Sequence, residues 1–206
     1  MCGRFALTVP AKLKAIFPNY RFPKIVPRYN IAPTQPVIAI PNTGTDEAQM
    51  IAWGMGGNIN ARAETVTEKP TFKHAARAQR AIVFADGYYE WKVLPDGKQP
   101  FYVRRADGEP FTFAALHDAA ACALITTAAR GSLASIHHRM PVILTEASRE
   151  RWLDERPLDD GTIAELLADV VCELESYPVS VAVNRVANDR PALIERVAPP
   201  EQPSLF

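Results

Sequence analysis

The run AIVFADGYYEWKVL, residues 81–94, decides the fold class of this chain. It is long and rich in β-branched and aromatic residues, which favour strands over helices. The segment KQPFYVRR, residues 98–105, has the same character, and the Pro-Asp-Gly of residues 95–97 between the two runs is typical of a tight turn. We therefore expect an antiparallel hairpin in the middle of the chain.

Further strand-like runs flank this hairpin on both sides. They are QPVIAI (35–40), AQMIAW (48–53), PFTFAALHD (110–118), CALITTAA (122–129) and YPVSVAV (177–183). Helical patterns cover residues 9–17, with Thr8 as cap, residues 146–155, with Thr145 as cap, and residues 163–171, with a capping box from Thr162 to Glu165. The pattern predicts an α+β fold: a single domain with a mostly antiparallel, barrel-like β core and a few peripheral helices. We expect this domain to span residues 1–198, followed by a flexible Pro-rich tail at 199–206.

The composition is that of an ordinary globular protein of 206 residues, 48% hydrophobic and 22% charged. No apolar run approaches the roughly 20 residues of a membrane span, and no signal peptide is evident, so a cytoplasmic location is expected. The net charge is zero but unevenly spread: residues 1–80 hold 11 Lys and Arg against 4 Asp and Glu. This asymmetry is compatible with a basic face for phosphates, and equally with solvated surface charge.

The three cysteines have different settings. Cys122 and Cys172 lie among apolar residues, as buried, inert thiols do, whereas Cys2 directly follows the initiator methionine. Removal of Met1 would leave an α-amine and a thiol on one residue. Such an amine, with a pKa of about 7.8, is far more often neutral near pH 7 than a lysine with a pKa of about 10.4. It can therefore condense with an aldehyde to an imine, which the thiol closes to a thiazolidine; alternatively, the thiol acts as a nucleophile with the amine as its base.

Two polar patterns lie on strand-like segments. In NINARAET, Asn60, Arg62 and Glu64 alternate and would share one face of an extended segment. This face is either a solvated surface or part of a site, in which the Asn60 amide orients a reacting group and the Arg62 guanidinium binds phosphate. In GYYEWK, alternation places Tyr88, Glu90 and Lys92 on one face. Glu90 is either half exposed or buried, and burial would raise its pKa and suit it to proton transfer.

The segment IHHRMPVIL, residues 136–144, places His137 and His138 just before an apolar strand. Adjacent side chains diverge, so at most one histidine is expected to face a given site. No HxH or HExxH spacing occurs, and His74 and His117 are isolated, which disfavours a zinc site. A histidine near a terminal amine would act as a general acid or base instead.

Seven segments, in this order, resemble the SRAP family, the SOS response-associated peptidases that are better described as abasic-site DNA–protein crosslinkers. They are MCGRF (1–5), RYNIAPTQ (28–35), WG (53–54), NARAET (60–65), FADGYYEWK (84–92), LITTAA (124–129) and IHHRMPVIL (136–144). The resemblance implies covalent capture of an abasic site in single-stranded DNA by Cys2 as a thiazolidine that shields the lesion. Strand cleavage and crosslink reversal are possible further activities, and the sequence does not determine whether cleavage accompanies capture. It further implies no metal or organic cofactor, a monomer, and a cytoplasmic, nucleoid-associated location.

The resemblance also assigns roles to individual residues. Asn60 would orient the terminal residue and the sugar, Glu90 would handle the proton and hydroxyl of the opened deoxyribose, and His137, rather than His138, would assist imine formation and ring opening. The residues assigned to DNA contacts are Arg4, Arg62, Thr127 and Arg139.

One departure and three alternatives accompany this interpretation. Family members have a longer, Pro- and Trp-rich segment between the Trp-Gly and Asn-Ala-Arg motifs, whereas here only residues 55–59 intervene. We expect weaker preference for strand junctions, unless an aromatic such as Tyr88 substitutes; junction binding as tight as that of longer-loop relatives would contradict this. The alternatives are an N-terminal-cysteine amidohydrolase, a peptidase limited to self-processing, and a non-covalent single-strand binding module.

Overall fold

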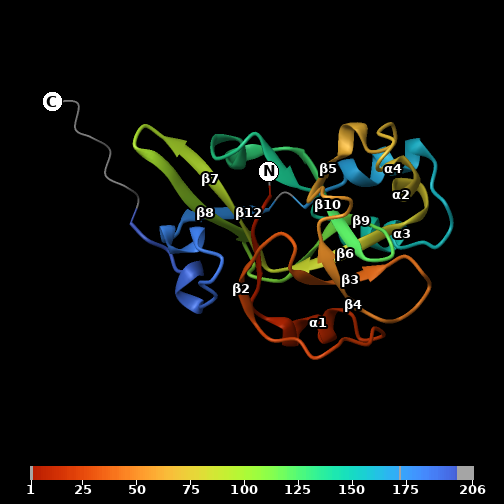
Figure 1. The fold of residues 1–206 in the computed structure, drawn as a ribbon, viewed down its shortest axis with the longest axis horizontal. Helices are drawn as coiled ribbons and strands as arrows, with labels where there is room; N and C mark the ends of the chain where they lie inside the picture. The colour runs from red at the N-terminus through yellow and green to blue at the C-terminus, as the bar shows by residue number, and fades with distance from the viewer. Residues whose placement is uncertain (1, 172, 199–206) are drawn as a thin grey trace.

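The computed structural model describes residues 2–171 and 173–198, which form two β-sheets with peripheral helices (Figure 1). The first sheet has five strands, and every neighbouring pair in it is antiparallel. In sheet order its strands are β12 (Leu174–Pro178), β8 (Gly97–Arg105), β7 (Gly87–Leu94), β1 (Phe5–Leu7) and β2 (Arg28–Ile31). The predicted central hairpin is confirmed as β7 and β8.

The second sheet closes into a barrel. Its strands are β3 (Pro36–Pro41), β4 (Gln49–Trp53), β5 (Asn60–Arg62), β6 (Arg80–Ala85), β9 (Phe111–His117), β10 (Ala121–Ala128) and β11 (Arg139–Pro141). Because β10 pairs with both β4 and β9, the ring β10–β4–β3–β6–β9 has no open edge. Among the pairings between strands in the described chain, only those of β10 with β4 and with β5 are parallel. The predicted α+β class with a mostly antiparallel, barrel-like core is confirmed.

Asp86 divides the run that decides the fold. Residues 81–85 continue β6 of the barrel, whereas residues from Gly87 onward belong to β7 of the other sheet, so the run is two strands and not one. The Asp86 carboxylate accepts hydrogen bonds from the backbone N–H and hydroxyl of Thr8 and from Val9 N at 2.8 Å. Thr8 is therefore held by Asp86, and the prediction that it caps the first helix is wrong. Val9 precedes α1 (Pro10–Ile16) without a side-chain cap.

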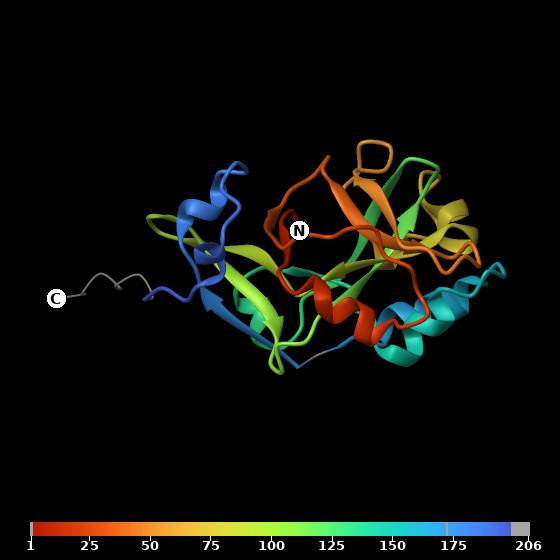
Figure 2. The same cartoon turned by 90° about the horizontal axis from the view of Figure 1, so that it is seen from below.

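The helices lie outside the barrel, with α2 (Lys73–Ala78), α3 (Glu146–Trp152) and α4 (Asp160–Ala168) at one end of the molecule (Figures 1 and 2). The Thr145 cap of α3 is confirmed, since its hydroxyl accepts from Ser148 N at 3.2 Å. The capping box at Thr162 is wrong: α4 begins earlier, and Asp159 accepts from Thr162 N at 2.9 Å. None of the helices in the described part of the chain is long and apolar enough to cross a membrane.

Short 3₁₀ helices replace part of the predicted regular structure. They are η1 (Ala63–Thr65), η2 (Gly131–Ser135), η3 (Val181–Asn184) and η4 (Pro191–Ile194). The last predicted strand, residues 177–183, is therefore wrong beyond Pro178, where β12 ends. The predicted flexible tail and Cys172 lie outside the described residues.

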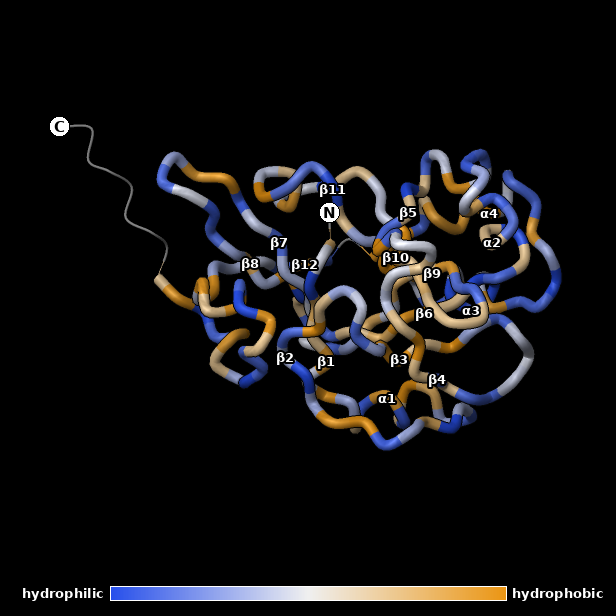
Figure 3. The backbone as a smooth tube through the Cα atoms, viewed as in Figure 1, coloured by the Kyte–Doolittle hydropathy of each residue, from blue (hydrophilic) through white to orange (hydrophobic). Residues whose placement is uncertain are grey.

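The core positions the start of the chain. Apolar residues dominate the barrel strands β3, β6 and β9 (Figure 3). The Phe5 ring on β1 packs edge-on against Trp53 and Phe113, with ring centroids 5.2 and 5.6 Å apart. Because Phe5 is anchored in the barrel core, the residues just before it lie in the middle of the molecule, where the two sheets meet (Figures 1 and 2).

Candidate functional site

Cys2 lies in a fully buried position beside the barrel. Its neighbour strand β1 pairs with β7 through Phe5 and Tyr88, and the Cys2 carbonyl accepts a hydrogen bond of 2.8 Å from the Asn60 side-chain amide. Cys2 itself is 0% exposed. The Asn60 Oδ1 atom is buried and accepts no hydrogen bond within the described chain. Asn60 thus holds the backbone of Cys2 and still has one acceptor directed into a buried space.

Glu90 on β7 lies on the same side of the sheet as Tyr88, as alternation predicts. Of the two predicted settings for Glu90, the structure has the buried one, with 5% exposure. Burial raises the pKa of Glu90 to about 7. Near neutral pH this carboxyl group therefore exists in both protonation states, as a group that takes up and releases protons must.

Tyr88 is also buried, with 1% exposure, and packs against Phe113. Burial raises the pKa of Tyr88, and negative charge on Cys2 or Glu90 would raise it further. A buried ring is not accessible for stacking on a DNA base. The suggestion that Tyr88 replaces the missing aromatic segment is therefore wrong.

Trp53 does not supply that aromatic function either. It is 0% exposed, and its indole N–H donates to the carbonyl of Ile59 at 2.8 Å. The intervening residues 54–59 form a compact turn that contains no aromatic residue. The short segment thus closes on the barrel and projects no ring.

His137 joins the same group of residues from the loop before β11. Its Nδ1 atom lies 4.0 Å from Glu90 Oε2 and accepts a hydrogen bond of 3.0 Å from the backbone N–H of Arg139. Burial lowers the pKa of His137, which favours the neutral imidazole. The His138 ring stacks on that of His137 with centroids 4.3 Å apart and is exposed. Of the two histidines, His137 is the one beside Glu90.

The Cys2 thiol is held in its protonated form. Burial raises the pKa of Cys2 far above its usual range, and the nearby Glu90 carboxylate raises it further. Deprotonation of the buried thiol is costly unless a neighbouring group takes the proton, and Glu90 is a titratable group whose charge acts on Cys2. The arrangement suits addition of a thiol with concerted proton transfer better than attack by a free thiolate.

A second set of predicted residues lines the rim of the barrel. β5 runs parallel to β10 with Arg62 opposite Thr126, and β11 pairs with β10 so that Thr127 lies opposite Met140 and next to Arg139 in register. Arg62 is exposed, whereas Thr127 is 9% exposed. The structure thus brings Arg62, Thr127 and Arg139 together on three adjacent strands.

Glu64 is the site residue whose role sequence reasoning did not assign. β5 ends at Arg62 and η1 begins at Ala63, so the predicted shared face does not extend to Glu64. Its carboxylate instead accepts two hydrogen bonds from the Arg139 guanidinium, at 2.8 and 2.9 Å. This pairing lowers the pKa of Glu64. No local signal could identify it, because the partner lies 75 residues further along the chain.

Arg4 lies apart from this rim. Its guanidinium donates to the Asn30 side chain at 2.7 Å and to the Val183 carbonyl at 2.8 Å. These bonds connect the residue just before β1 with β2 and with η3 near the carboxyl end of the described chain. The predicted phosphate contact from Arg4 therefore requires the guanidinium nitrogen atoms that these two bonds do not use.

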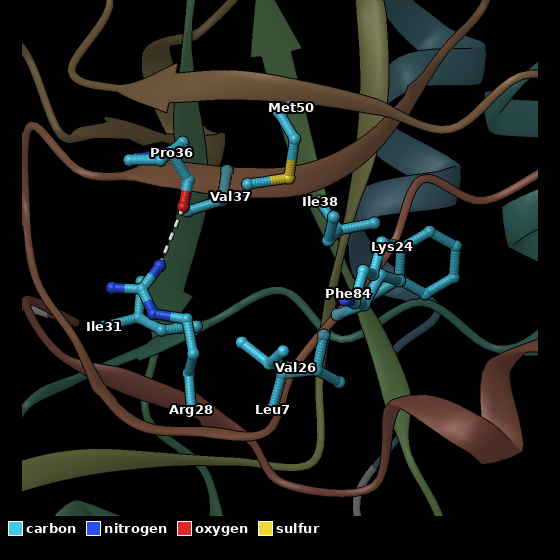
Figure 4. Close-up of a pocket in the computed structure, with 11 residues that line it drawn as sticks. Leu7, Lys24, Val26, Arg28, Ile31, Pro36, Val37, Ile38, Met50 and Phe84 are labelled. Carbon is cyan, nitrogen blue, oxygen red and sulfur yellow. Dashed lines mark hydrogen bonds between the residues drawn. The ribbon is translucent and has the colours of Figure 1, made fainter. Parts of the chain in front are cut away.

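An apolar cavity of about 80 Å³ lies elsewhere, between the segment before β2 and strands β3 and β4 (Figure 4). Leu7, Val26 and Val37 line it, and the Arg28 side chain closes one side by donating to the Pro36 carbonyl at 2.9 Å. It includes none of the predicted site residues. In residues 2–171 and 173–198, no group of three or more His, Cys, Asp or Glu side chains is placed to hold a metal ion.

Solved structures share this fold. A protein of Bacteroides thetaiotaomicron superimposes with a TM-score of 0.85 at 24% identity, covering 96% of this chain and all of the other. The class defined so far is thus a barrel protein with a buried thiol at the start of the chain, next to a carboxyl group and an imidazole.

Sequence comparisons define the family. The model described as "SOS response associated peptidase (SRAP)" matches residues 1–186. The abasic site processing protein YoqW of Bacillus subtilis is 33% identical over 95% of this chain and 99% of its own length. The abasic site processing protein YedK of Escherichia coli is 33% identical over 96% of this chain and its whole length. This chain belongs to the SRAP family.

Proposed function

We propose that this protein processes abasic sites by capturing them in single-stranded DNA through a covalent bond to Cys2. The observation that carries the proposal is the position of the Cys2 thiol, which is buried next to Glu90, with His137 Nδ1 4.0 Å from the same carboxylate and Asn60 on the Cys2 carbonyl. The names of the relatives support the substrate class.

The reaction begins when removal of Met1 releases the α-amine of Cys2 from its peptide bond. The amine adds to the aldehyde carbon of the ring-opened deoxyribose and loses one water to form an imine. The thiol then adds to the imine carbon: a sulfur–carbon bond forms, the nitrogen gains the proton that the sulfur gives up, and a five-membered thiazolidine closes. One water is released overall, and the balance needs no oxidant or reductant.

The site residues divide this work. Asn60 holds the Cys2 backbone and presents its free Oδ1 to the sugar. Glu90, with a pKa of about 7, takes the thiol proton and returns it to nitrogen or to the sugar hydroxyl. His137 assists loss of water during imine formation and its addition during reversal. Arg62, Arg139 and Thr127 contact the phosphates on either side of the lesion, and Arg4 contributes from the far side of β1.

Intact-mass spectrometry tests this proposal. The purified protein is mixed with a single-stranded oligonucleotide that contains one abasic site, and the Cys2→Ala variant is the control. We expect a covalent adduct on the wild-type chain alone, without Met1 and stable to denaturation without a reductant. A folded, Met1-processed protein that forms no adduct would refute the proposal.

A binding assay and a hydrolysis assay on the same two proteins separate the alternatives. A non-covalent binding module would keep all of its function in Cys2→Ala, whereas a crosslinker keeps binding and loses capture. An amidohydrolase or peptidase would release glutamate from glutamine or cleave a peptide without DNA. The raised pKa of the Cys2 thiol argues against these two, because both depend on attack by the sulfur on a poorly reactive amide.

A further inference from the structure

Arg139 has the most constrained guanidinium on the rim. Both terminal nitrogens donate to the Glu64 carboxylate, and Nη2 also donates to the Thr126 carbonyl at 2.6 Å. Its Nε atom is buried and has no hydrogen-bond partner within residues 2–171 and 173–198. The side chain of Arg139 is only 11% exposed. The donors that would bind a phosphate are therefore already used by a carboxylate of this chain.

Arg62 on β5, on the other side of β10, differs in this respect. It is exposed and forms no ion pair within the described chain. Of the two arginines on the strands that flank β10, Arg62 is open to a DNA phosphate and Arg139 is occupied. A phosphate and a carboxylate compete for the same pair of parallel donors, because both offer two oxygens at matching spacing.

Glu64 is the partner that can move. It lies on the short η1 helix with 47% of its side chain exposed, against 11% for Arg139. The Thr127 hydroxyl approaches it at 3.4 Å, which is a weak contact. A rotation of the Glu64 side chain into solvent would open the Arg139 guanidinium without displacing any strand.

We propose that Glu64 is a specificity-determining residue that competes with DNA phosphates for Arg139 and so weakens binding to intact single strands. The inference rests on the proposed function, because it concerns the same rim. Intact DNA must displace Glu64 with binding energy alone, whereas an abasic site is also held by the covalent bond to Cys2. The carboxylate thereby restricts occupancy of the site to damaged strands.

The test measures non-covalent binding of an intact fluorescent single strand by anisotropy, in a Cys2→Ala background and from 50 to 300 mM salt. Glu64→Gln removes the competing charge. We expect it to bind roughly 3- to 5-fold more tightly, the change in affinity that corresponds to the loss of one partly exposed ion pair. The slope of log affinity against log salt should steepen by about 0.7, since one more phosphate is neutralised on a single strand.

Glu165→Gln is the matched control. Glu165 forms an ion pair of 2.6 Å with Arg151 on the helices, and its substitution changes the net charge by the same amount. We expect its affinity to remain within twofold of the parent. A gain of equal size in Glu165→Gln would assign the effect to net charge and overturn the inference.

A double substitution isolates the pair. In Glu64→Gln with Arg139→Gln, the gain over Arg139→Gln alone should disappear, because Glu64 then has no guanidinium to occupy. Unchanged or weaker binding by Glu64→Gln would overturn the inference. Failure of all variants to bind intact strand at the lowest salt would also overturn it, and adduct formation on the abasic strand would then determine separately whether the proposed function fails.

Discussion

Two thiols of this protein are equally buried and differ in almost everything else. Cys2 and Cys122 are both 0% exposed, and burial raises the pKa of both, to about 12 for Cys122. Cys122 lies on β10 opposite His117 on β9, so it even has a histidine in register. The backbone nitrogen of Cys122, however, is bound in a peptide bond, and the residues on either side of Cys122 pack in the barrel core. Only the thiol at the start of the chain can be joined by a free amine, and that thiol lies beside Glu90.

The largest expected effect comes from removing each thiol in turn. Cys2→Ala should abolish the covalent adduct, a loss of more than about 100-fold, because the sulfur that closes the thiazolidine is absent. Cys122→Ala should keep the rate of capture within about threefold. Gel-shift and mass measurements on the same abasic strand give both values. If both variants lose capture to the same extent, the loss comes from impaired folding and not from the chemistry of the Cys2 thiol.

Glu90→Gln tests the neighbour that distinguishes Cys2. We expect capture to slow by roughly 10²- to 10³-fold at pH 8, the usual contribution of a general acid or base. The carboxylate form increases through pH 7, so the ratio of wild-type to variant rate should rise between pH 6 and pH 8. Single-turnover rates at several pH values provide the ratio. If the ratio does not depend on pH, Glu90 does not transfer a proton and acts only by positioning its neighbours.

The same substitution should stabilise the fold. The pKa of Glu90 is higher in the folded chain than in the unfolded one, so the folded state binds the proton more tightly and loses stability as pH rises from about 4.5 to about 7. Relative to wild type, Glu90→Gln should gain on the order of 2–3 kcal/mol at pH 8 and little at pH 4.5. Urea unfolding at the two pH values measures this difference, and Glu165→Gln should show no such increase.

Arg62→Gln is expected to have the smallest effect. Its exposed guanidinium should contribute one phosphate contact, so the salt slope for single-strand binding should fall by about 0.7 and the affinity by several-fold. The rate of capture at saturating DNA should not change, because Arg62 does not contact Cys2. A lower rate of capture at saturating DNA would mean that Arg62 on the rim takes part in the reaction together with the buried residues.

The fold class and most of the strands could be predicted because their signals are local. Alternating and apolar runs identified β3, β4, β7, β8, β9 and β10, and the hydroxyl of Thr145 identified the start of α3. The division of residues 81–94 at Asp86 could not be predicted, because the partners of that carboxylate, Thr8 and Val9, lie more than 70 residues away. The cap of the first helix was wrong for the same reason.

The residue types that an aldehyde trap needs, and the strand alternation that places Glu90 and Tyr88 on one side, can be read from the sequence alone. The burial of Glu90, the 4.0 Å distance from its Oε2 to His137 Nδ1 and the pairing of Glu64 with Arg139 follow from the tertiary structure alone. The reason is physical: a pKa shift depends on burial and on charges a few ångströms away, and in a closed barrel those neighbours come from strands far apart in the chain.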